Sequence, residues 1–181
     1  MTWLFTARER FGPDTHPEGW RGYLEFSGFR HIQELVSADS ILCGDVITEL
    51  VDEDWDHNVH ADYRITLFTN FEYLARRTGV DLIKHNILGI LERPTHENEK
   101  PPTDFEHCGF DILDSYDSVS VLTNCGKYPG IMDPQEVNQF GLLSNLVRAN
   151  TIGAKIRTAF PDENHCRDCR VWSIARYMIC K

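Results

Sequence analysis

The chain has 181 residues and a formal net charge of −10, and 41% of its residues are hydrophobic. That composition is typical of a globular domain, so disorder is not the default expectation. No apolar run approaches the ~20 residues that a membrane-spanning helix needs, and the first residues do not match a secretory signal. We therefore expect a cytoplasmic protein with reduced thiols and no membrane partner.

The charge is unevenly distributed along the chain. Residues 31–63 contain nine Asp or Glu and neither Lys nor Arg, and residues 101–126 contain five acidic residues with the same lack of cations. Residues 127–181 instead carry eight basic and five acidic residues. An acidic field repels phosphate backbones, so we expect no nucleic-acid partner. The same field attracts basic proteins and accelerates their association.

The first part of the chain mixes turn residues with short apolar patterns. Residues 20–26 alternate roughly between apolar and polar side chains, which predicts a strand. The apolar residues of 29–36 fall on one face of a helix, and 45–50 is a second short helical candidate. Residues 52–62 are polar and are interpreted as a loop.

The middle of the chain gives clearer signals. Residues 69–77 predict a helix, because Thr69 or Asn70 can cap its start. The apolar residues of 82–91 predict a strand, which ends before a proline. Residues 94–104 are polar and contain prolines, so they are a candidate for a long loop or a weak domain boundary.

The second half contains the strongest periodicity. Two short β-type runs, 110–113 and 119–122, predict a hairpin, and Asp133 has the capping-box pattern of a helix start. Residues 142–160 predict a helix. Apolar residues in 171–179 recur at spacings of 0, 3, 4, 7 and 8, which predicts a last helix.

These elements together predict the fold class. Strands dominate the middle and helices the end, without a regular βαβ alternation. We therefore predict a single α+β domain over residues 1–181. It would have short antiparallel strands in the middle and helices concentrated in the C-terminal third.

A cysteine and histidine cluster near the C-terminus suggests metal binding. Two thiolates in a Cys-x-x-Cys spacing can reach one zinc ion, and an adjacent histidine can add a nitrogen ligand. The predicted zinc ligands are His165, Cys166, Cys169, His107 and Cys108. The alternatives are a redox Cys-x-x-Cys pair and cysteines that simply pack in the core.

Cys125 is a candidate nucleophile. It follows an apolar run and precedes a glycine, and a tight turn after a strand can display a reactive side chain. Catalysis would also need a histidine base and a group that orients that base. The sequence offers His107, His165 and Asn124 for these roles, and the alternative is a small buried cysteine.

The acidic stretch around Trp55 is a candidate contact surface. An aromatic anchor surrounded by carboxylates suits a basic protein partner. The predicted contact residues are Asp52, Glu53, Asp54, Trp55, Asp56 and Asp62. The alternatives are a transition-metal site that includes His57 and His60, and an ordinary solvated loop.

The function that best fits these features is non-catalytic. The sequence has no phosphate-binding glycine loop, Gly-x-Ser-x-Gly or His-Glu-x-x-His motif. We therefore predict a binding protein, such as an inhibitor or immunity protein that neutralises a basic toxin through its acidic surface. The alternatives are a Cys125-dependent hydrolase or transferase and a domain stabilised by zinc.

Overall fold

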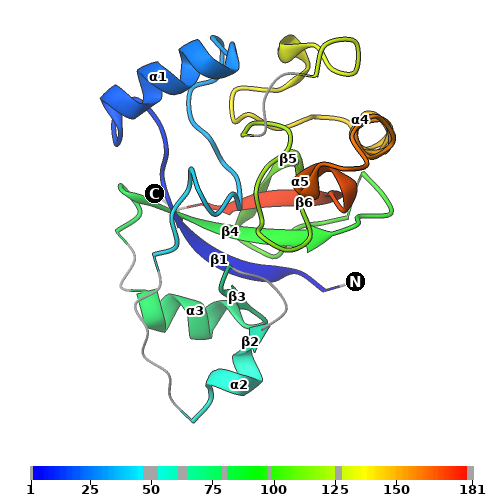
Figure 1. Ribbon diagram of the computed structural model, residues 1–181. Helices are drawn as coiled ribbons and strands as arrows, with labels where there is room; N and C mark the ends of the chain where they lie inside the picture. The colour runs from blue at the N-terminus through cyan, green and yellow to red at the C-terminus, as the bar shows by residue number, and fades with distance from the viewer. Residues whose placement is uncertain are drawn as a thin grey trace.

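One antiparallel sheet lies at the centre of the computed structural model, which describes residues 2–46, 53–60, 65–78, 81–97, 99–124 and 128–178. Figure 1 shows helices above and below this sheet. Its six strands lie in the order β2-β3-β1-β4-β6-β5. The predicted α+β class and the antiparallel pairing are therefore confirmed. In the described part of the chain, no helix is long and apolar enough to cross a membrane.

The sheet combines five strands from residues 4–113 with a last strand near the C-terminus. The strands are β1 (Leu4–Glu9), β2 (Val59–His60), β3 (Leu67–Phe68), β4 (His85–Glu92), β5 (Phe105–Leu113) and β6 (Arg170–Tyr177). The helices are α1 (Pro17–Ser27), α2 (Trp55–Asn58), α3 (Phe71–Thr78), α4 (Leu146–Ala159) and α5 (Asn164–Arg167), and Pro134–Glu136 form a 3-10 turn, η1. Segments before and after residues 94–104 thus contribute to the same sheet.

The C-terminal segment departs most from the sequence-based prediction. Residues 170–177 form β6, hydrogen-bonded between β4 and β5, so the predicted helix over 171–179 is wrong. Five consecutive residues of this strand are buried. A strand covered on both faces is apolar at nearly every position, and such a run also contains the helical spacing.

The predicted strand over 20–26 is also wrong, because these residues belong to α1. Pro17 lies at the start of this helix, and Gly28 ends it with a left-handed φ of 76°. Trp20 and Tyr23 are buried three residues apart on one face. Proline at the start and glycine after the end are helix signals that outweigh the rough alternation. Helices are therefore only partly concentrated in the C-terminal third.

Two further predicted elements are irregular chain. Residues 29–36 form no helix. Leu35 instead pairs with Phe11, two residues beyond the end of β1, in an isolated β-bridge. Residues 119–122 contain turns instead of a second hairpin strand, with one bridge between Leu113 and Ser120. Side chains in both segments are held by tertiary contacts, which local periodicity does not report.

A capping signal located α3, whereas α4 was predicted from its apolar spacing. Asn70 accepts hydrogen bonds from the backbone N–H groups of Glu72 and Tyr73 at the start of α3. Asn145 caps α4, which begins four residues later than predicted. The capping box at Asp133 is present, but it starts only the short turn η1. Residues 47–50 of the predicted helix 45–50 lie outside the described residues.

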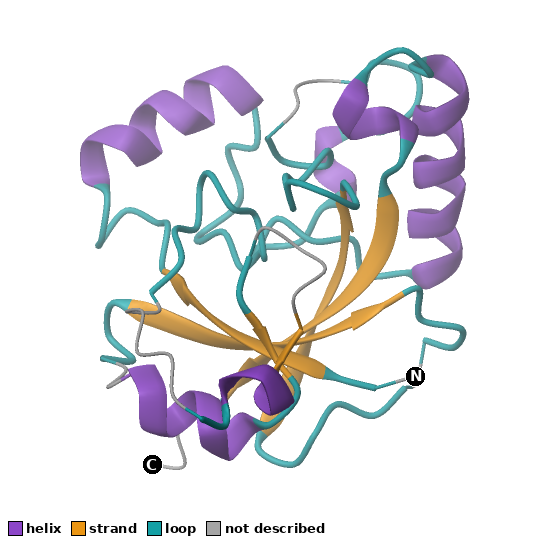
Figure 2. Cartoon of the chain, turned by 60° about the horizontal axis from the view of Figure 1, so that its bottom comes forward, coloured by secondary structure: helices purple, strands orange, loops and turns teal. Residues whose placement is uncertain are grey.

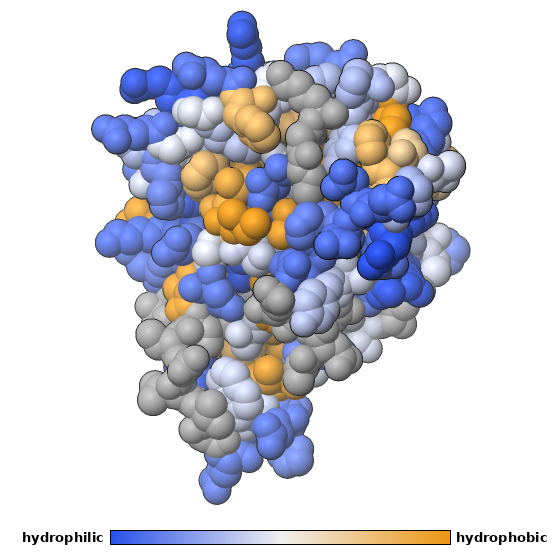
Figure 3. Space-filling view, viewed as in Figure 1, coloured by the Kyte–Doolittle hydropathy of each residue, from blue (hydrophilic) through white to orange (hydrophobic). Residues whose placement is uncertain are grey.

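Both faces of the sheet carry a packed core. Figure 2 shows helices on either side of the strands. On one side α1 and α4 pack over the sheet through buried residues such as Trp20, Ile112 and Ile152. On the other side α3 packs against β1 and β3 through Phe68 and Leu74. The space-filling view in Figure 3 shows hydrophobic patches on the surface between α1 and the sheet and beside α4.

Candidate functional site

A cavity of about 440 Å³ lies where α5 meets the turn that follows β5. We call it the His165 cavity. The residues that line it are Ile41, Val119, Asn124, Tyr128, Phe160, Glu163, His165 and Cys166. Its volume falls in the range of pockets that hold small ligands, and its walls combine apolar side chains with a few polar groups.

His165, which lines the cavity, is paired with an aspartate behind it. The Nδ1 atom of His165 lies 2.8 Å from Oδ2 of Asp114. Because a carboxylate can only accept, Nδ1 carries a hydrogen, and in the neutral imidazole this tautomer leaves the lone pair on Nε2. The side chain of Asp114 is 4% exposed and that of His165 is 42% exposed. A buried carboxylate that orients an accessible imidazole is the arrangement of a general base.

Turn chemistry fixes the position of Asp114. Its Oδ1 accepts hydrogen bonds from the backbone N–H groups of Tyr116 at 2.8 Å and Asp117 at 2.6 Å. Its Oδ2 accepts a third from the N–H of Val119 at 3.0 Å. Aspartate closes turns in this way. The carboxylate is therefore rigid before it contacts His165.

Packing of α5 fixes the position of His165. The neighbouring residue Cys166 is buried, and its Sγ lies 3.4 Å from the hydroxyl of Tyr128. The hydroxyl of Ser115 also donates to the carbonyl of Asp168, at the end of α5. This bond and the His165–Asp114 contact both tie the helix to the turn after β5.

Asn124 supplies a carboxamide on another wall. Its Nδ2 donates to Oδ2 of Asp39 at 3.1 Å, which leaves Oδ1 as an acceptor. Asp39 is itself buried and accepts from the N–H of Ser120 at 2.7 Å. The structure thus brings together Asn124 and His165, two of the groups that the Cys125 hypothesis needs. Cys125 follows Asn124 in the sequence and lies outside the described residues.

His107, the other predicted base, is not part of the cavity. It lies on β5, where its Nε2 is 3.0 Å from the hydroxyl of Ser173 on β6. Its ring also packs against Phe110, with centroids 4.9 Å apart. Burial lowers the pKa of His107. These contacts indicate that His107 has a structural role in the sheet.

A buried carboxyl group supports the segments around the cavity. Asp111 on β5 accepts from the hydroxyls of Ser37 at 2.5 Å and Ser120 at 2.7 Å. It is fully buried, and this burial raises its pKa to about 6. The network joins β5 to Ser37 and to the turn that leads to Asn124. No sequence motif identified Asp114 or Asp111, because their partners are distant in the chain.

The predicted zinc ligands lie on two separate elements. His107 and Cys108 belong to β5, whereas His165, Cys166 and Cys169 lie in or just after α5. Burial raises the pKa of the thiols of Cys108 and Cys169 to about 11. Among the residues that the structure describes, no three His, Cys, Asp or Glu side chains are grouped to hold a metal. The zinc site remains a prediction.

The acidic stretch has two different environments. Glu53, Asp54 and Asp56 are exposed, and Trp55 is half-buried with its ring edge against Phe68. Asp52 and Asp62 lie outside the described residues. Other carboxylates of 31–63 are bound within the fold: Glu34 pairs with Arg10, Asp39 accepts backbone hydrogen bonds, and Asp45 pairs with Arg8. The surface charge is therefore smaller than the sequence count suggests.

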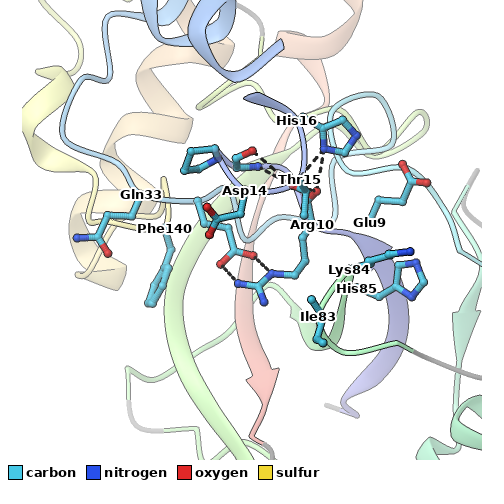
Figure 4. A pocket seen from close by; sticks show the side chains of 13 residues that line it. Glu9, Arg10, Asp14, Thr15, His16, Gln33, Ile83, Lys84, His85 and Phe140 are labelled. Carbon is cyan, nitrogen blue, oxygen red and sulfur yellow. Dashed lines mark hydrogen bonds and ion pairs between the residues drawn. The ribbon is translucent and has the colours of Figure 1, made fainter. Parts of the chain in front are cut away.

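A second cavity of about 630 Å³, the Glu34 cleft, lies between the end of β1 and the start of β4. Figure 4 shows Arg10 at its centre, with Lys84 and His85 on one side and Phe140 on the other. Glu34 accepts two hydrogen bonds from Arg10, at 2.7 and 2.8 Å, and one from Arg176 at 3.2 Å. The carboxylate of Glu34 is therefore paired with two guanidinium groups. We interpret this ion-pair cluster as structural, because it joins the segment of Glu34 to the end of β1 and to β6.

Comparison with family models, curated proteins and solved structures found no match to this chain.

Proposed function

We propose that the protein is a hydrolase or acyl transferase in which His165 is the general base. The observation that carries this proposal is the 2.8 Å hydrogen bond from Nδ1 of His165 to the buried carboxylate of Asp114. This bond holds one tautomer and leaves Nε2 as the proton acceptor. The cavity beside it has space for a small substrate.

Cys125, the candidate nucleophile of the alternative function considered from the sequence, is the proposed nucleophile. In this scheme Nε2 of His165 takes the thiol proton, and the thiolate attacks the carbonyl carbon of an ester. A C–S bond forms, the C–O bond breaks, and the leaving alkoxide receives the proton from His165. Water or another acceptor then attacks the thioester with the same base, and the thiol is regenerated. The support for Cys125 is its place next to Asn124, which lines the His165 cavity.

Hydrolysis of 4-nitrophenyl acetate tests the proposal. General-base catalysis contributes about 10²–10⁴-fold to a rate, so His165→Gln and Cys125→Ser should each lower turnover by about 10²-fold or more. His96→Gln is the control, because His96 is an exposed histidine in the loop before β5. Turnover that is the same in His165→Gln and in the wild type would contradict the proposed role.

Binding of a basic protein is a second candidate function. The exposed carboxylates of Glu53, Asp54 and Asp56 beside the half-buried ring of Trp55 favour it. An inhibitor or immunity protein for a basic toxin would use such a surface. Partners captured from the native host should be basic, and their association should slow with salt. Asp54→Lys with Asp56→Lys should slow association, whereas Asp162→Lys, at an exposed site beyond α4, should not.

A further inference from the structure

We propose that the His165 cavity binds an alkylammonium group, such as a quaternary ammonium ion or a lysine side chain. This inference rests on the proposed function, because it names the charge class of the substrate for the same site. Three properties of the cavity support it: the charges around it, the acceptors it offers and its aromatic wall.

The charges around the cavity are negative. Glu163 is exposed at its rim, and Asp114 lies directly behind His165. Among the described residues that line the cavity there is neither a lysine nor an arginine. An unbalanced carboxylate next to a partly desolvated space attracts a cation and disfavours an anion.

The polar side chains of the cavity offer mainly acceptors. Two donors of the lining residues point away from a ligand, since Nδ2 of Asn124 donates to Asp39 with one of its two hydrogens and Nδ1 of His165 donates to Asp114. Oδ1 of Asn124, Nε2 of His165 and the carboxylate of Glu163 remain as acceptors. A lysine ammonium can donate to these acceptors, and a quaternary ammonium ion is attracted to them by its charge. For an anionic ligand the described lining side chains offer only the hydroxyl of Tyr128 and the second N–H of Asn124 as further strong donors.

An aromatic pair forms the apolar wall. The rings of Tyr128 and Phe160 lie with centroids 5.4 Å apart and planes inclined by 60°. Aromatic faces attract cations, and aromatic side chains near a carboxylate are a recognised way to hold alkylammonium ions. The side chains of Ile41 and Val119 add apolar surface that suits the alkyl part of such a ligand.

A pair of isosteric ligands tests the charge preference directly. Choline and its neutral carbon analogue, 3,3-dimethylbutan-1-ol, would be titrated into the Cys125→Ser protein by calorimetry and by NMR. We expect choline to bind about tenfold more tightly, from a cation–π and carboxylate contribution of that size. A second comparison asks whether the cation belongs to a protein side chain or to a free small molecule. A peptide that contains one lysine or one trimethyllysine is compared with the same peptide carrying norleucine at that position.

Matched variants assign the effect to the cavity. Glu163→Gln should weaken choline binding several-fold and leave the neutral analogue unchanged. Glu25→Gln is the control, because Glu25 is an exposed carboxylate on α1. Equal affinities of choline and the neutral analogue, or tighter binding of butyrate, would overturn the inference. Because binding is measured without turnover, a cation preference in a protein that hydrolyses no ester would contradict only the proposed function.

Discussion

His165 and Asp114 are 51 positions apart in the chain, yet Nδ1 of the imidazole lies 2.8 Å from the carboxylate. The bond joins α5 to the turn that follows β5. Neither residue has a sequence motif around it that predicts the pair, because α5 and the turn meet only through the tertiary fold. The same bond sets the tautomer of His165 and so its capacity to accept a proton at Nε2.

Asp114→Asn should weaken both the turn and the histidine. An asparagine has one acceptor oxygen where the aspartate uses both, so at least one of the three N–H donors or His165 loses its partner. We expect a destabilisation of about 1–3 kcal/mol and a shift of the His165 tautomer. Chemical denaturation and the ¹⁵N shifts of the imidazole measure the two effects, with Asp162→Asn at an exposed site as the control.

Glu34→Gln should remove an acid-sensitive part of the stability. Burial alone would raise the pKa of Glu34, but hydrogen bonds from Arg10 and Asn86 outweigh it and hold that pKa below its ordinary value. The ionised carboxylate therefore stabilises the fold above about pH 4. This contribution is lost as the pH falls through the lowered pKa. Melting curves should show a large difference from the wild type at neutral pH and a small one in acid, and a constant difference would contradict this.

Asp111→Asn should have the opposite pH profile. Burial raises the pKa of Asp111 to about 6, from an ordinary value of 3.8. Between these values the unfolded chain has released the proton while the folded protein retains it, so wild-type stability falls as the pH rises. Above about pH 6 this contribution is constant. The variant should therefore gain stability relative to the wild type from about pH 4 to pH 6, and an unchanged difference would contradict the assignment.

Gly109→Ala and Gly22→Ala should change stability in opposite directions. Gly109 has a φ of 142°, and an added Cβ would lie 2.8 Å from the carbonyl oxygen of Leu143. We expect a loss of about 2–4 kcal/mol there. Gly22 lies inside α1 and has no atom within 4 Å of the added Cβ. Alanine should stabilise that helix by about 1 kcal/mol, and urea denaturation of both variants would check the two signs.

The sequence predicted those elements that depend on neighbouring residues. The caps at Asn70 and the apolar run of β4 are local signals, and both elements are present. The segment of Trp172 was misassigned because a strand buried on both faces and a helix share its apolar spacing. The candidate site was only partly predictable. His165 and Asn124 were named as available groups, but their common cavity depends on contacts between α5 and distant turns.

The rate at which Cys125 is alkylated tests the central claim most directly. Iodoacetamide labelling followed by peptide mass spectrometry would give this rate as a function of pH, with the buried Cys43, whose pKa burial raises to about 12, as the slow internal reference. If His165 takes the thiol proton, Cys125 should react much faster than Cys43 near neutral pH, and His165→Gln should slow it by about tenfold or more. An alkylation rate of Cys125 that is the same in the wild type and in His165→Gln would contradict the account.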